Sequence, residues 1–184
     1  MGRCLHARFL SLGVANPKID IHDIAARLWE TADELRANMP YPPMSMENLR
    51  ELEVPSLAAD DAVCWLWTTN AFMGEAHQLM SRWGFETKTI LTWCKPGRLG
   101  LGDWLRNNTE HCLLGVKGHP LWLNRKVTTI LNAPSTKHSA KPEEFFALVE
   151  KLCLGNKVEL FSRRKRPGWA AWGDEVAVEE SIAV

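Results

Sequence analysis

The chain has 184 residues, which is enough for one globular domain and too few for a long repeat array. Hydrophobic residues make up 46% of it and charged residues 24%, ordinary values for a globular protein that argue against wholesale disorder. Because 22 Lys and Arg balance 22 Asp and Glu, the sequence excludes a basic coat that grips nucleic acid by charge alone, although it does not exclude a local basic patch.

Tryptophan and cysteine usage narrows the class further. The nine tryptophans, against a single tyrosine, are typical of a dense core or of aromatic surfaces for flat ligands. The five cysteines lie far apart without a C-x-x-C pair, so we expect no zinc finger and no metal. Their odd number, without a signal peptide, predicts a reduced cytoplasmic protein, in a prokaryote or a phage-infected host, and no apolar run approaches the roughly 18 residues that a membrane span needs.

The first 38 residues carry the weakest patterns of the chain. Residues 9–14 predict a short buried strand that Asn16 and the following proline would end. Apolar residues at helical spacing predict a helix over 21–37. Three prolines make 39–44 an irregular loop, and Ser45 is the expected N-cap of a short helix that follows.

From residue 60 onwards, strands and helices alternate. In chain order the patterns predict strand 62–67, helix 72–83 ended by Gly84, strands 86–93, 110–116 and 127–131, helix 142–152 with proline at its first position, and a final strand 157–161. This order predicts an α/β fold whose sheet has helices on both faces. Ligands of such folds bind at the carboxyl ends of the strands, which directs attention to residues 16–17, 68–70, 95–96, 117–118 and 162–163.

Lys141 stands at the N-terminus of the helix predicted for 142–152. A cation there opposes the helix dipole by about 0.3–1 kcal/mol, whereas a bound anion would reverse that sign. The alternative is a solvated lysine, with the glutamates that follow satisfying the dipole.

A basic run, residues 163–166, follows the last predicted strand. Four consecutive cations can contact phosphates, and the alternative is a solvated turn. The glycines of 97–102 do not form a dinucleotide-binding fingerprint, so this segment is either a substrate loop or simply a connection.

Nine segments then combine into a recognisable order. They are 41–45 (YPPMS), 60–67 (DDAVCWLW), 83–85 (WGF), 93–95 (WCK), 100–107 (GLGDWLRN), 110–118 (EHCLLGVKG), 141–144 (KPEE), 159–163 (ELFSR) and 167–173 (PGWAAWG). Their order and spacing resemble the MT-A-type N6-adenine methyltransferases, the family of the eukaryotic mRNA N6-adenosine methyltransferase and of bacterial and phage DNA-modifying relatives. The resemblance covers about residues 39–176 and implies a Rossmann-like methyltransferase sheet that uses S-adenosylmethionine.

The resemblance also implies roles for individual residues. Lys141 is similar to the family lysine that meets the methionine carboxylate, and Arg163 to the arginine near the cofactor ribose. The cofactor-binding set implied in this way is Lys141, Leu160, Arg163, Asp174 and Glu175, whose carboxylates can accept from a ribose diol. The substrate-binding set is Tyr41, Trp67, Trp93, Trp104 and Glu110, joined by the basic residues Arg164, Lys165 and Arg166, and core packing is the alternative for each tryptophan.

The family's catalytic Asp-Pro-Pro-Trp motif is absent from this sequence. In the family this motif accepts the hydrogens of the adenine amine and aims its lone pair at the methyl group. Asn16, after the first predicted strand, is the one candidate at a comparable place, either as a degenerate catalytic position or by coincidence.

Three hypotheses follow for function. The first is an N6-adenine methyltransferase acting on DNA or RNA, and the second a non-catalytic nucleic-acid-binding or partner subunit, either of which can form an oligomer with itself or a related methyltransferase. The third is an incomplete gene product. In each case we expect a divergent segment 1–38, a methyltransferase-like core 39–176 and an acidic tail 177–184.

Overall fold

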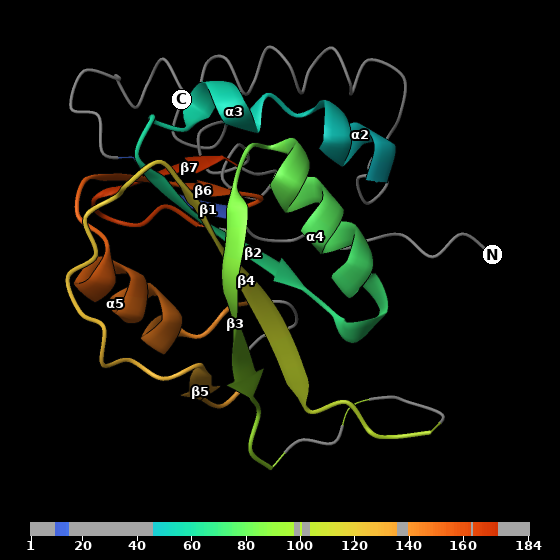
Figure 1. Cartoon of the computed structure of the whole chain (residues 1–184). Helices are drawn as coiled ribbons and strands as arrows, with labels where there is room; N and C mark the ends of the chain where they lie inside the picture. Colours follow the sequence, from blue (N-terminus) through green and yellow to red (C-terminus); the bar gives the residue numbers. More distant parts are fainter. Residues whose placement is uncertain are drawn as a thin grey trace, which may run out of the picture.

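One seven-stranded sheet organises the molecule (Figure 1), a computed structural model that describes residues 10–14, 46–97, 100, 104–135, 140–162 and 164–172. The strands lie in the order β5-β3-β4-β2-β1-β6-β7. Their bounds are β1 Leu10–Val14, β2 Ala62–Thr68, β3 Glu86–Cys94, β4 Thr109–Lys117, β5 Ile130–Asn132, β6 Asn156–Leu160 and β7 Trp169–Trp172.

Strand direction divides the sheet into two groups. β4 pairs antiparallel with both β2 and β3, and β1 pairs antiparallel with both β2 and β6. β5 runs parallel to β3, and β7 runs parallel to β6. Five strands therefore end at one edge of the sheet, where β1 and β4 begin.

Helices cover both faces of the sheet, as the sequence predicts. α2 (Met46–Glu51), α3 (Val54–Leu57) and α4 (Met73–Arg82) lie on one face, and α5 (Glu143–Leu152) lies on the other (Figure 1). All seven residues of β2 are buried, and the six apolar ones alternate between two apolar clusters, one beneath each helical layer. This burial explains the unbroken apolar run of β2, because a strand covered on both faces has no solvent side.

The end of α4 follows from one glycine. Gly84 has a φ of +79°, a left-handed conformation that costs glycine little because it has no Cβ. The backbone N–H of Phe85 then donates to the carbonyl of Met80, closing the helix end and leading directly into β3. The predicted helix and its glycine stop are confirmed.

Four details of the prediction are wrong. The last strand is β7, not the strand before it, and Pro142 is the N-cap of α5, not its first helical residue. β5 is shorter than the predicted 127–131 segment and begins at Ile130. Because β4 is antiparallel to its neighbours, Lys117 and Gly118 lie at the edge of the sheet opposite the ends of β2 and β3. The predicted helix 21–37 and Ser45 lie outside the described residues.

The described part of the chain contains no helix long and apolar enough to cross a bilayer. It also contains no group of three or more His, Cys, Asp or Glu side chains arranged to hold a metal ion.

Candidate functional site

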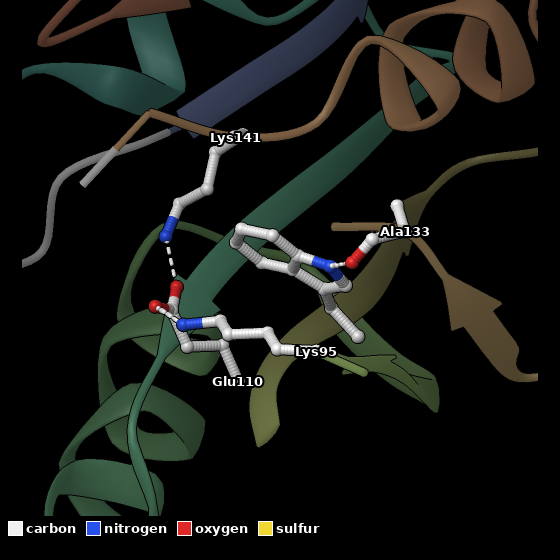
Figure 2. A network of polar contacts seen from close by, with 5 residues as sticks. Lys95, Glu110, Ala133 and Lys141 are labelled. Carbon is white, nitrogen blue, oxygen red and sulfur yellow. Dashed lines mark hydrogen bonds and ion pairs between the residues drawn. The ribbon is translucent and has the colours of Figure 1, made fainter. Parts of the chain in front are cut away.

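Three charged side chains converge at the edge where β2, β3 and β6 end. Lys95 follows β3, Glu110 is the second residue of β4, and Lys141 precedes α5. The ammonium groups of Lys95 and Lys141 each donate to a different oxygen of the Glu110 carboxylate (Figure 2). One carboxylate thus contacts side chains that lie 15 and 31 residues away from it in the chain.

This cluster is largely removed from water. The side chain of Lys141 is only 7% exposed, and those of Lys95 and Glu110 are 17% and 21% exposed. An isolated charge at such depth is costly, so the mutual pairing is what allows these groups to remain ionised.

Two indole rings form the apolar wall behind the lysines. The ammonium of Lys95 lies 4.4 Å from the ring centroid of Trp93, and that of Lys141 lies 4.6 Å from the ring of Trp67. The two rings meet edge to face, with centroids 6.0 Å apart. The Trp93 Nε1 donates to the carbonyl oxygen of Ala133 at 2.7 Å, which fixes the ring (Figure 2). The wall therefore combines cation–π attraction with core packing.

The pairing governs the ionisation of the cluster. Burial raises the pKa of Glu110, but the charges and hydrogen bonds of Lys141 and Lys95 outweigh burial and bring that pKa below its usual value. Burial lowers the pKa of Lys141, and Glu110 opposes this change. The carboxylate is consequently held ionised, and the two ammonium groups present a net positive charge to the strand edge.

The structure brings together four of the predicted site residues, namely Trp67, Trp93, Glu110 and Lys141. Leu160 is buried at the end of β6, at the same edge of the sheet. Trp104 does not belong to this wall, because it is 98% exposed on the connection between β3 and β4.

Two residues of the basic run are engaged within the protein. Arg164 and Arg166 both form ion pairs with Glu143, in the first turn of α5. Lys165 is also exposed in the β6–β7 connection. The predicted residues Asn16, Tyr41, Arg163, Asp174 and Glu175 lie outside the described residues, so their assigned roles stay predictions.

Sequence reasoning did not single out Lys95, although it belongs to one of the strand-end pairs noted in the sequence. It also missed Glu159, which is 7% exposed within β6. Burial raises the Glu159 pKa to about 7, partly offset by a hydrogen bond from Ser162 and by the charge of Arg166. An acid in the middle of the apolar 158–161 segment was the available signal for such a group.

The mixed sheet with helices on both faces is that of a Rossmann-like methyltransferase fold, in which ligands bind at the carboxyl ends of the strands. A model of the MT-A70 family matches residues 11–175, so the chain belongs to the MT-A70 family of N6-adenine methyltransferases.

Curated relatives from distant organisms agree with this membership. The chain is 34% identical over 154 residues to the Drosophila melanogaster N(6)-adenosine-methyltransferase MT-A70-like protein, covering 78% of this chain and 25% of that protein. It is 29% identical over 194 aligned positions to the human N(6)-adenosine-methyltransferase catalytic subunit METTL3, covering 94% of this chain and 30% of the human protein. It is 35% identical over 149 residues to the type II methyltransferase M.MunI of a Mycoplasma species, covering 76% of this chain and 61% of that enzyme.

Proposed function

We propose that this chain binds S-adenosylmethionine at the edge carrying Lys141 and acts on adenine in DNA or RNA. The observation that supports this proposal is the buried cluster of Lys95, Glu110 and Lys141 against two indole rings. The chain spans about a quarter to a third of the length of the animal relatives named above. The activity of those whole proteins is therefore proposed for this chain.

The donor set at this edge fits an amino-acid cofactor. The ammonium of Lys141 has three N–H donors, one of which goes to Glu110, so further donors remain for a ligand carboxylate. S-adenosylmethionine, when bound, supplies a methyl group activated on a sulfonium.

Different residues of the chain would bind the cofactor and the substrate. Lys141 and Leu160 would hold the cofactor, together with Arg163, Asp174 and Glu175 from outside the described residues. Trp67, Trp93 and Glu110 would line the substrate side, with Tyr41 beside the adenine.

We propose further that methyl transfer by this chain is weak. The Asp-Pro-Pro-Trp motif is absent from the sequence, and each lost transition-state acceptor costs about 2.7–4 kcal/mol, on the order of a hundred- to thousandfold in rate. The direction of β1 does not favour Asn16 as a replacement. Val14 pairs with Ala62 and Asn156, the first residues of β2 and β6, so β1 ends at the edge opposite Lys141.

The second candidate function is a non-catalytic subunit that assembles with a related methyltransferase. The observation that favours it is the pair Trp104 and Leu105, which are 98% and 84% exposed on the β3–β4 connection. Two adjacent large apolar side chains in water favour contact with another macromolecule.

One pair of measurements separates the two functions. Transfer of labelled methyl groups from S-adenosylmethionine into adenine-containing DNA and RNA oligonucleotides tests catalysis, and calorimetry with S-adenosylhomocysteine tests the site. Lys141→Ala should weaken cofactor binding by about 1.5–3 kcal/mol, the range for a charge-assisted hydrogen bond. Binding without transfer would favour the non-catalytic subunit, and absence of binding by the parent protein would overturn the cofactor site.

A further inference from the structure

One face of α5 contacts the connection between β6 and β7, and the start of β7, through ion pairs, an aromatic ring and a hydrogen bond. Glu143, Phe146 and Glu150 are spaced three and four residues apart, so they share one face of the helix. At the first turn, Glu143 accepts from Arg164 and, at 2.8 Å, from Nη1 of Arg166. We call Glu143, Arg164 and Arg166 the arginine clamp.

Aromatic contacts attach the same connection and the start of β7 to α5 further along the helix. The guanidinium of Arg166 lies 3.6 Å from the ring centroid of Phe146, and Phe146 meets Trp169 edge to face with centroids 5.6 Å apart. The Trp169 Nε1 donates to Glu150 at 2.8 Å. The first residues of β7 and the connection before it are therefore attached to α5 over two helical turns.

Ser162 adds hydrogen bonds at the start of the connection. The backbone N–H of Ser162 donates to the carbonyl of Trp172 at 2.8 Å, and its hydroxyl donates to the carbonyl of Arg164 at 2.8 Å. Arg166 is only 16% exposed, so its charge is largely desolvated, in contrast to the 61% exposed Arg164. A buried, stacked guanidinium holds its carboxylate partner in a narrower geometry than a solvated side chain can.

The clamp acts directly beside the proposed cofactor site. Glu143 lies two residues after Lys141, with Pro142 between them, and Pro142 fixes the backbone at the N-cap of α5 with a φ of −70°. Anything that holds Glu143 in place therefore restricts the position from which the Lys141 side chain extends.

We propose that the arginine clamp positions Lys141 for the cofactor carboxylate, so that Glu143 is a positioning residue acting through Arg164 and Arg166. This inference rests on the proposed function. It assigns an intramolecular role to two of the four cations of the basic run, in place of contact with nucleic-acid phosphates.

The test compares two glutamates of the same helical turn. Glu143→Gln removes the carboxylate of the clamp, and Glu144→Gln makes the same charge change at the neighbouring exposed position. By calorimetry, Glu143→Gln should weaken S-adenosylhomocysteine binding about three- to tenfold, and Glu144→Gln should leave it unchanged. Glu143→Asp, which keeps the carboxylate, should recover most of the affinity.

A second ligand isolates the role of Lys141. Methylthioadenosine lacks the amino-acid carboxylate, so its affinity should not change in Glu143→Gln. An equal loss for both ligands would overturn the route through Lys141, because a general loosening of the fold affects both alike. Thermal unfolding of each variant accompanies these measurements and reports whether the fold is intact.

The remaining outcomes separate this inference from the proposed function. Binding by the parent protein, with equal affinities in the Glu143→Gln and Glu144→Gln variants, would overturn the clamp alone. No binding by the parent protein would overturn both. If Arg164→Gln with Arg166→Gln lowers the salt dependence of oligonucleotide binding but not cofactor affinity, the arginines contact phosphates and the clamp is overturned.

Discussion

The same arrangement of charges occurs at two places in this molecule, in different surroundings. Glu110 accepts from two lysines among buried side chains, whereas Glu143, which is 59% exposed, accepts from the exposed Arg164 and from the largely buried Arg166. Because Glu143 is far more exposed than Glu110, water screens its ion pairs more. We therefore expect loss of Glu110 to destabilise the fold strongly and loss of Glu143 to affect mainly geometry.

The largest effect should come from Glu110→Gln. Removing one partner from a buried ion pair costs about 3–5 kcal/mol, and we expect about 3 kcal/mol because Lys141, whose pKa burial already lowers, can release its proton. Urea unfolding at neutral pH measures this loss, with the exposed Glu47→Gln as control.

The sign of the pH dependence sharpens this prediction. Between the lowered folded-state pKa of Lys141 and its ordinary value of 10.5, the unfolded chain binds more protons than the folded one. Stability of the Glu110→Gln variant should therefore recover as the pH rises across that interval. A loss that stays constant with pH would contradict the buried-charge interpretation.

Glu159 is a buried carboxyl in which burial, not pairing, decides the pKa. Its pKa is raised from 4.5 to about 7, so between these values the unfolded chain has released a proton that the folded chain retains. This group should therefore lower stability by on the order of 3 kcal/mol as the pH rises from 4.5 to 7. Glu159→Gln should remove that slope, measured as the difference in unfolding free energy from the parent protein at each pH.

Trp93→Phe should have an intermediate effect. It leaves the carbonyl of Ala133 without the indole donor, which costs about 1–3 kcal/mol for a buried group. Trp67→Phe is the matched control, since the Trp67 indole N–H has no partner among the described residues and its loss should cost less. Equal losses in chemical denaturation would show that ring volume matters more than the hydrogen bond.

The smallest stability effect should come from Glu143→Gln. The ion pair of Glu143 with the exposed Arg164 contributes about 0–1 kcal/mol, and screening over a Debye length of about 8 Å at physiological salt reduces this further, whereas the pair with Arg166, which is 16% exposed, is screened less. Unfolding at low and high salt should therefore give a small difference that decreases at high salt. A loss as large as that of Glu110→Gln would remove the distinction between the two clusters.

Local patterns were sufficient to predict most of the sheet and helices. The apolar run of β2 and the helical spacing of α4 and α5 predicted these elements correctly. Each pattern reflects the burial of the element on one or both sides, so it can be recognised in the sequence. Strand direction was not predictable in this way. β4 runs antiparallel to both β2 and β3, and no residue pattern within β4 indicates its direction.

The candidate site shows the same division. Lys141 was found through its place before a helix and through resemblance, and its partner Glu110 through resemblance alone. The bridge from Glu110 to Lys95 depends on a register in which Trp93 faces Glu110 across β3 and β4, which only the paired strands reveal. The arginine clamp was not predictable for a similar reason. The sequence of a basic run is the same whether its side chains are solvated or form ion pairs with a distant helix.

The exposure of Trp104 has an optical consequence. Among the tryptophans of the described residues, Trp104 is 98% exposed and Trp122 is partly buried, whereas the others are each 7% exposed or less, namely Trp65, Trp67, Trp83, Trp93, Trp169 and Trp172. An indole in water emits at longer wavelengths than a buried one and collides freely with quenchers such as iodide. Among the described residues, Trp104 should therefore contribute most to the red edge of the fluorescence. It lies on the connection that joins β3 to β4, near Lys95 and Glu110, so a nucleic acid or a protein subunit that binds there should shift the emission without any added label.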